Sequence, residues 1–166
     1  MKTAKQKTLF ITYASVIAAM YTVLTMLAFA FGLSGGAIQV RFSESLCILA
    51  YFTPAAIPGL FAGCLISNIL SGAMVLDVIL GSLATLIGAI FTYLLRKLHP
   101  ILAPIPPIIA NTAIIPPILK YVYGLTEGTA YLYLTVFAGE VISCGVLGLV
   151  LLYALKKRSS VLFPKI

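Results

Sequence analysis

The segment Thr8–Phe31, TLFITYASVIAAMYTVLTMLAFAF, is dominated by apolar residues and contains no charged side chain. A helix of about 20 apolar residues is long enough to cross the hydrocarbon core of a bilayer. A signal peptide is the alternative for such an N-terminal run, but its apolar core is only about 7–15 residues long. The segment therefore predicts a retained first membrane span.

Similar apolar stretches follow along the rest of the chain. Of the 166 residues, 61% are hydrophobic and 9% are charged, whereas a soluble domain is about half apolar and about a quarter charged. Turn-forming residues divide the chain into apolar segments at approximately 8–32, 38–53, 55–72, 75–96, 104–122 and 129–155. We therefore expect an all-α integral membrane protein in which residues 1–166 form a single domain, a bundle of six transmembrane helices.

The basic residues lie in short flanks of these segments, and their distribution predicts the topology. Six crossings place both termini on one face, which then carries nine of the 11 Lys and Arg side chains. The nine are Lys2, Lys5, Lys7, Arg96, Lys97, Lys156, Lys157, Arg158 and Lys165, and the other two are Arg41 and Lys120. By the positive-inside rule, both termini are cytoplasmic. No basic stripe with interleaved aromatics indicates binding of nucleic acid.

Polar side chains inside the predicted spans gather at mid-depth or toward the outer face. They are Glu44, Asn68, Asp77, Asn111, Lys120 and Glu140. An ionisable group inside a bilayer is costly and usually has both a partner and a function. The pattern predicts a polar ligand pocket that opens to the outside, with Arg41 at its edge.

Several of these residues also have purely structural interpretations. Arg41 and Glu44 are three positions apart, so they can form an ion pair on one helix face instead of binding a ligand. Asp77 can cap the N-terminus of its helix. Glu140 has no basic neighbour in the sequence, so either Lys120 on another helix or a ligand rich in N–H groups is expected to satisfy its carboxylate.

Prolines and small residues suggest how the helices are shaped and packed. Several prolines fall in segment 104–122, which we expect to be kinked and to line the cavity. Gly59 and Gly63 have the spacing of a helix-packing pair, and packing within the chain is the expected use. Ala14 and Ala18 share that spacing and offer a smooth face to another subunit.

The sequence also argues against several other classes of function. Gly32–Gly36 fits the G-x-S-x-G pattern of hydrolases, but the only histidine, His99, is expected at the opposite membrane face. The three cysteines lack metal-ligand spacing, and there is no phosphate-binding loop. We therefore expect neither an enzyme nor a metal site. A small channel or an assembly subunit remains an alternative.

Seven blocks of sequence, spread in order along nearly the whole chain, form a specific pattern. They are VRFSESL (40–46), YFTPAAIPGLF (51–61), GCL (63–65), NILSG (68–72), LDVILGSLAT (76–85), LKYVYG (119–124) and GEVIS (139–143). With these blocks the chain resembles the QueT family.

The resemblance implies a substrate-binding S component of an energy-coupling factor (ECF) transporter in the bacterial plasma membrane. Such a component captures its ligand outside and docks on a T component with two cytoplasmic ATPases, which use ATP. The implied ligand is a queuosine precursor, a 7-deazaguanine such as queuine or preQ1, and no cofactor is expected on this chain. An alanine motif on the first helix contacts the T component in such proteins, and Ala14 and Ala18 match it. An S component for another vitamin is the alternative.

The ligand contacts that we expect rest on chemistry and not on the resemblance. A deazaguanine presents a ring N–H beside an exocyclic amine, and one carboxylate can accept from both. Glu140 or Asp77 is the predicted acceptor. Asn68 and Asn111 have amides that can serve the remaining donors and acceptors of the ring.

Two further groups complete the predicted site. Phe137 or Tyr121 is expected to stack on the flat ring of the ligand. An aminomethyl precursor also carries a cation, which needs a second carboxylate, and Glu44 is the first choice.

Overall fold

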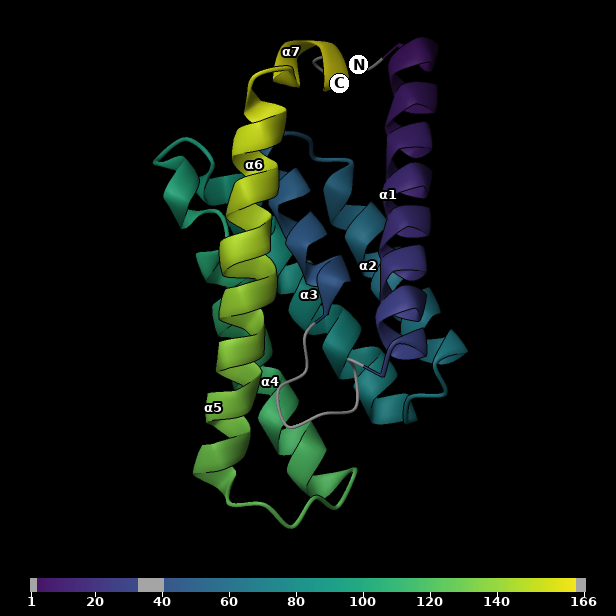
Figure 1. Cartoon of the computed structure of the whole chain (residues 1–166). Coiled ribbons are helices and arrows are strands. Elements are labelled where there is room, and N and C mark those ends of the chain that lie inside the picture. The colour runs from purple at the N-terminus through teal and green to yellow at the C-terminus, as the bar shows by residue number, and fades with distance from the viewer. Residues whose placement is uncertain (1–2, 33–40, 164–166) are drawn as a thin grey trace.

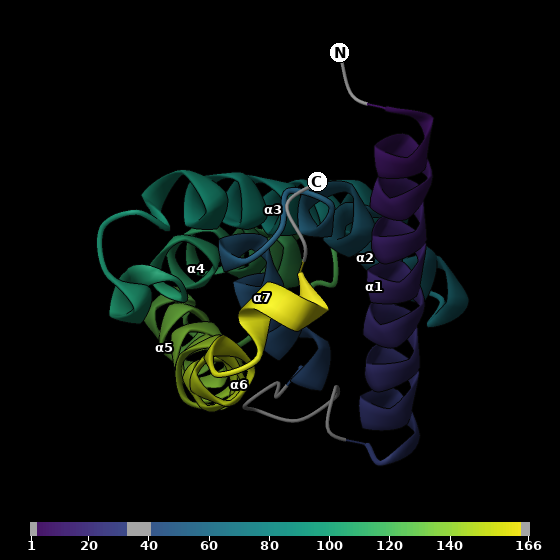
Figure 2. The same cartoon turned by 90° about the horizontal axis from the view of Figure 1, so that it is seen from above.

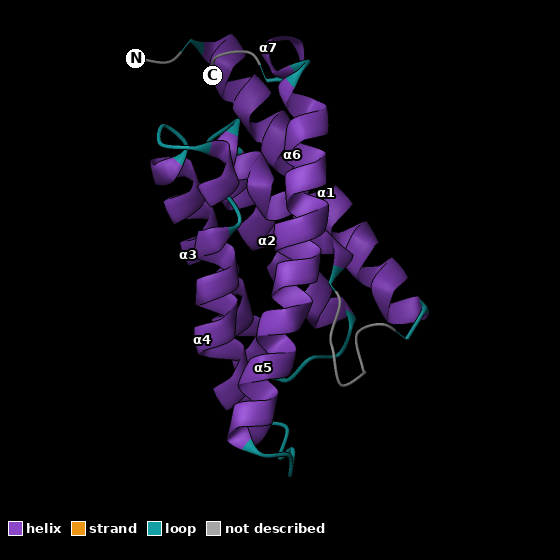
Figure 3. Ribbon diagram, turned by 60° about the vertical axis from the view of Figure 1, so that its left-hand side comes forward, coloured by secondary structure: helices purple, strands orange, loops and turns teal. Residues whose placement is uncertain are grey.

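The computed structural model describes residues 3–32 and 41–163, and the secondary structure within these residues is helical (Figure 3). Helix α1, Ala4–Ala30, begins with a capping box in which Thr3 and Gln6 bond each other's backbone N–H groups. The chain then turns at Gly32, whose φ of 71° is accessible to glycine at little cost. The prediction of a first long apolar helix is confirmed.

The remaining helices follow one another through short turns (Figure 1). They are η1 (Phe42–Tyr51), α2 (Ala56–Leu70), α3 (Val75–Leu95), η2 (Pro100–Leu102), α4 (Ile105–Tyr121), α5 (Thr129–Glu140), η3 (Val141–Leu147), α6 (Gly148–Lys156) and α7 (Ser159–Leu162). The last long helix is continuous from Thr129 to Lys156, because α5, η3 and α6 differ only in their winding, with η3 in the wider π form.

Four of the described helical stretches are long and apolar enough to cross a membrane. They are Ala4–Ala30, Val75–Leu95, Pro100–Tyr121 and Thr129–Lys156. Helices η1 and α2 are apolar but contain only 10 and 15 residues. A 15-residue α-helix is about 22 Å long, less than the ~30 Å of a hydrocarbon core. In the part of the chain that the structure describes, the predicted apolar segments are thus largely helical, and four helical stretches there have the length of a full span.

Helix η1 occupies the centre of the bundle. Figure 2 shows the longer helices arranged around it, and η1 packs against α1, α2, α3, η3 and α6. Most of its side chains are buried. Its 3₁₀ winding rises about 2.0 Å per residue, against about 1.5 Å in an α-helix, so ten residues reach further along the bundle axis.

Glycines bring α1 and α2 into direct contact. A Cβ on Gly59 would lie 2.7 Å from the Ala14 carbonyl oxygen, and one on Gly63 would lie 2.9 Å from the Ala18 carbonyl oxygen. No side chain fits at such distances, so the glycines allow the two backbones to touch. The prediction that this glycine pair packs within the chain is confirmed.

Proline and glycine also shape the contact between α3 and α4. A Cβ on Gly88 would lie 2.7 Å from the Pro107 Cα. Pro116 and Pro117 lie inside α4, which remains helical across both of them and carries Leu119 to the cavity described below.

The two ends of the described chain lie toward the same end of the bundle (Figure 1). The Tyr13 hydroxyl of α1 donates a 2.7 Å hydrogen bond to the Leu162 carbonyl. The Phe163 ring stacks on Phe52, with 5.1 Å between the ring centroids. These contacts fasten α7 across the first helix and the central helix.

Candidate functional site

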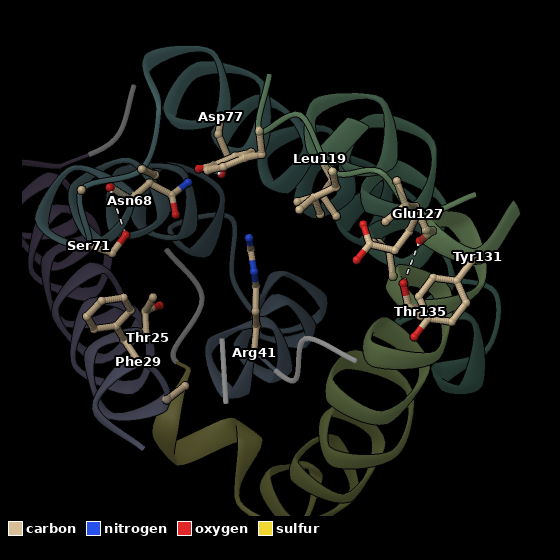
Figure 4. Close-up of a pocket in the computed structure, with 17 residues that line it drawn as sticks. Thr25, Phe29, Arg41, Asn68, Ser71, Asp77, Leu119, Glu127, Tyr131 and Thr135 are labelled. Carbon is tan, nitrogen blue, oxygen red and sulfur yellow. Dashed lines mark hydrogen bonds between the residues drawn. The ribbon is translucent and has the colours of Figure 1, made fainter. Parts of the chain in front are cut away.

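A cavity of about 610 Å³ lies toward the end of the bundle away from α7. Its lining consists of Thr25, Ala28, Phe29, Arg41, Asn68, Ser71, Gly72, Ala73, Asp77, Leu119, Tyr123, Leu125, Glu127, Tyr131, Leu132, Thr135 and Val136. These residues come from α1, the start of η1, α2, α3, α4, α5 and the turns that follow α2 and α4, and Figure 4 shows the labelled side chains surrounding a common space. The volume is typical of small-molecule sites, which measure about 300–1,000 Å³.

Asp77, in the first turn of α3, places a partly unsatisfied carboxylate on the cavity wall. Its Oδ2 accepts a 2.8 Å hydrogen bond from the Tyr123 hydroxyl, which in turn accepts one from the Met74 N–H at 3.2 Å. Its Oδ1 is buried and has no hydrogen-bond partner among the described residues. The N-cap position of the helix is Met74, and no side chain caps it, so the capping interpretation of Asp77 is wrong.

The Tyr123 hydroxyl is protonated at neutral pH and can therefore donate to Asp77. Partial burial raises its pKa above the ordinary value, the hydrogen bond from Met74 lowers it, and the Asp77 carboxylate raises it again. The result is a raised pKa, so the neutral hydroxyl is favoured in the folded chain. The contribution of the neutral Tyr123 hydroxyl to the stability of the folded chain is complete below the ordinary tyrosine pKa. It is lost only as the pH rises through the raised pKa.

Tyr123→Phe is expected to destabilise the cavity wall. The substitution removes the donor to Asp77 and the acceptor for Met74, and one lost hydrogen bond of this kind costs about 1 kcal/mol. Thermal unfolding of the purified chain in detergent measures the loss. Tyr121→Phe is the matched control, because Tyr121 is 81% exposed and lies outside the cavity. Equal unfolding temperatures for the two variants would contradict the role given to the Tyr123 hydroxyl.

Asn68, near the end of α2, lies beside Asp77. Its side chain is only 6% exposed, and its Nδ2 makes a long 3.6 Å contact to the Cys64 sulfur. A Cβ on Gly81 would lie 3.3 Å from both the Asn68 Nδ2 and the Asp77 Oδ1. An amide and a carboxylate therefore converge above the same glycine of α3, where they present both donors and acceptors to the cavity.

Arg41 enters the cavity from the start of η1. Its guanidinium extends toward the side on which Asn68 and Asp77 lie (Figure 4). Its backbone N–H donates to the Ser143 hydroxyl at 3.2 Å, but its guanidinium has no hydrogen bond or ion pair with any described residue. The alternative in which Arg41 pairs with Glu44 is therefore wrong.

Glu44 lies one turn further along η1 and does not line the cavity. It is 1% exposed, and its Oε1 accepts a hydrogen bond from the Tyr21 hydroxyl. Its Oε2 accepts from the Cys47 thiol at 3.1 Å and from the Asn111 amide at 3.4 Å. With both oxygens occupied from three directions, Glu44 and Asn111 belong to a buried polar layer and not to the cavity wall.

Glu140 belongs to the same buried layer. It is 7% exposed and close enough to Glu44 for the two carboxylates to repel each other, and its Oε2 has no hydrogen-bond partner among the described residues. It is the last residue before the π-wound segment η3, a kind of irregularity that is frequent at functional sites. Lys120 does not pair with it, because the Lys120 ammonium donates to the Thr129 hydroxyl.

The structure places the other predicted contacts outside the cavity. Lys120 and Tyr121 follow Leu119, the residue of α4 that lines the cavity, and Phe137 follows Val136, which lines it from α5. Lys120, Tyr121 and Phe137 themselves are not part of the cavity lining. Tyr121 and Phe137 are 81% and 47% exposed. The prediction that either one stacks over the ligand is therefore not supported by their positions.

Other residues of the lining were missed in the sequence. Phe29, Tyr123 and Tyr131 supply the aromatic side chains of the wall, and Glu127 supplies a second carboxylate. Glu127 belongs to the predicted break at residues 124–128, which suggested only a connecting loop. The sequence did contain one signal for Glu127, since it is a charged residue in a short loop between two apolar segments.

Two further predictions from the sequence concern a nucleophilic serine and a metal site. The G-x-S-x-G segment lies mainly outside the described residues, which stop at Gly32 and resume at Arg41. Within the described part of the chain, no group of three or more His, Cys, Asp or Glu side chains is placed to hold a metal ion.

Comparison with known proteins assigns the chain to a family. The family model described as "QueT transporter" matches residues 11–157. The chain belongs to the QueT transporter family. The queuosine precursor transporter QueT of Lactococcus lactis subsp. cremoris (strain MG1363) is 43% identical over 83 residues, which are 50% of this chain. The chain spans about half of that relative's length, 48%. No solved structure matches significantly.

Membership in the QueT family confirms the resemblance predicted from the sequence blocks. Together with four helices long enough to span a bilayer, it identifies a multi-pass membrane protein of a transporter family. The cavity is therefore the natural candidate for the site of a small transported molecule.

Proposed function

We propose that this chain captures a queuosine precursor, a 7-deazaguanine such as queuine or preQ1, in the cavity from the outer face of the membrane. The observation that carries the proposal is the buried Oδ1 of Asp77, an acceptor without a partner among the described residues. Such an unpaired group costs about 1–3 kcal/mol, and a ligand that donates hydrogen bonds to it removes this penalty.

Asp77 is the preferred acceptor for the ring N–H and the exocyclic amine of the base. It lines the cavity, whereas Glu140 lies in the buried layer. Each carboxylate oxygen has two lone pairs, so Oδ2 can keep the Tyr123 hydroxyl while it accepts a second bond. Asn68 and Arg41 provide donors for the ring carbonyl and nitrogens, whereas Glu44 does not line the cavity and accepts hydrogen bonds on both oxygens in the buried layer.

Aromatic side chains of the lining support the binding of a flat ring. Phe29 comes from α1, Tyr123 from the turn after α4, and Tyr131 from α5. They take over the stacking role first expected of Tyr121 and Phe137.

The Asp77 carboxylate also distinguishes between bases. Adenine-like bases would place an acceptor where deazaguanine has its ring N–H, and that acceptor would face the Asp77 carboxylate.

The proposed function also includes the transport of the bound deazaguanine into the cell. The chain acts as the S component of an ECF importer, with six membrane crossings and both termini in the cytoplasm of a bacterium. A T component and two ATPases supply movement and ATP hydrolysis. An apolar groove between α1 and α2 supports this assembly, and Ala14, Ser15, Ala18, Ala19, Thr22, Val23, Pro58, Ala62 and Ile66 line it.

Isothermal titration of the purified chain in detergent tests the binding step. Queuine and preQ1 are the ligands, and guanine is the control because it lacks the substituted carbon at position 7. We expect saturable one-to-one binding of both deazaguanines and much weaker binding of guanine. Absence of heat from a folded chain would contradict the proposal and would favour an S component for another vitamin, or a channel or assembly subunit.

A further inference from the structure

The walls of the cavity carry an unequal number of positive and negative charges. Among the described residues that line it, the charged ones are Arg41, Asp77 and Glu127. Residues 33–40 contain no charged residue in the sequence, so they do not alter this count. One cation and two carboxylates leave an excess of one negative charge.

The positions of these groups assign the excess to Glu127. Figure 4 shows Arg41 extending toward the side of Asn68 and Asp77, and Asp77 is the carboxylate whose charge attracts the guanidinium most strongly. Glu127 stands on another wall, with Leu119 between it and Asp77 (Figure 4). Lys120, the nearest basic residue in the sequence, is engaged by Thr129 and does not line the cavity.

The surroundings of Glu127 suit a cation that remains partly hydrated. Tyr131 lies beside it on the same wall and contributes an aromatic ring, and Thr135 contributes a hydroxyl (Figure 4). A ring face attracts an ammonium group through its quadrupole, and a carboxylate adds a charge-assisted hydrogen bond.

We propose that Glu127, together with Tyr131, selects ligands that carry an ammonium group over neutral ligands of the same shape. This inference rests on the proposed function, because Asp77 and Asn68 then hold the base at the other end of the cavity. In a 7-deazaguanine, the substituent at position 7 projects away from the edge that carries the exocyclic amine. The base edge and the ammonium group therefore reach different walls of the cavity at the same time.

Two compounds of nearly equal size test the selection. 7-Aminomethyl-7-deazaguanine carries the ammonium group, and 7-cyano-7-deazaguanine has a neutral nitrile in its place. Glu127→Gln is expected to weaken binding of the aminomethyl compound about tenfold, the loss of one charge-assisted contact, and to leave the affinity for the cyano compound nearly unchanged. Isothermal titration of the full-length chain in detergent measures both dissociation constants.

Two variants serve as controls. Glu127→Asp retains the charge and is expected to preserve most of the preference for the aminomethyl compound. Thr126→Ala alters the same loop at a residue outside the lining and is expected to change neither affinity.

The outcomes separate this inference from the proposed function. Binding of both compounds with an unchanged affinity ratio in Glu127→Gln would overturn the selection by Glu127 and leave the deazaguanine site intact. Failure of the folded wild-type chain to bind either compound would overturn both. A fall in both affinities by the same factor would make Glu127 a structural residue of the loop.

Discussion

Asp77→Asn is expected to lower the affinity for a deazaguanine about a hundredfold, because it replaces two charge-assisted hydrogen bonds by contacts that include a donor facing a donor. The amide oxygen of the new residue can still accept from the Tyr123 hydroxyl, so the wall of the cavity keeps its shape. The amide NH₂ group then occupies the position of Oδ1 and meets the N–H groups of the base. Isothermal titration with queuine measures the change, and thermal unfolding confirms that the variant is folded.

Glu140→Gln is the informative comparison, since it makes the same chemical change at the other carboxylate first expected to read the base. Glu140 is buried outside the cavity lining, so its amide variant is expected to affect binding much less than Asp77→Asn does. The reverse result, with binding lost in Glu140→Gln and retained in Asp77→Asn, would place the base in the buried polar layer. It would refute the assignment of Asp77.

Hydropathy and turn residues were sufficient to predict the longer helices among the described residues, but neither their winding nor the short helices η2 and α7. The last predicted segment, at 129–155, agrees with the observed Thr129–Lys156 within a residue. The segment at 38–53 was correctly read as apolar, yet the pattern does not reveal that Phe42–Tyr51 is a 3₁₀ helix at the centre of the bundle. That position depends on which helices surround it, and a single apolar run does not encode its neighbours.

Only part of the candidate site could be predicted, because the sequence reveals which residues are polar but not the direction in which each helix faces. Asn68 and Asp77 were found because amide and carboxylate groups are rare in apolar helices, and both line the cavity. Glu44 met the same criterion but faces Tyr21 and Asn111, because the side of a helix that meets the cavity depends on its rotation within the bundle. Glu127 was overlooked because a charge in a loop is normally no more than solvated.

Substitutions in the groove between α1 and α2 are expected to have a large effect on transport. Replacing both Ala14 and Ala18 by Leu is expected to abolish deazaguanine uptake in cells that also produce the T component and the ATPases. Both alanines line the groove and are half-buried, and leucine side chains would fill the space that a partner helix needs. Uptake of a labelled deazaguanine and co-purification of the partner subunits measure the effect.

Ligand binding by the isolated chain separates a docking defect from a folding defect. The groove and the cavity share no lining residue, so the Ala14→Leu/Ala18→Leu chain is expected to bind queuine with unchanged affinity. Ala30→Leu, an exposed change at the far end of α1, is the matched control and is expected to retain uptake. If the double variant still transports, then the alanines serve only the contact with Gly59 and Gly63. If it loses both binding and transport, then the α1–α2 contact supports the fold, and the partner must dock elsewhere.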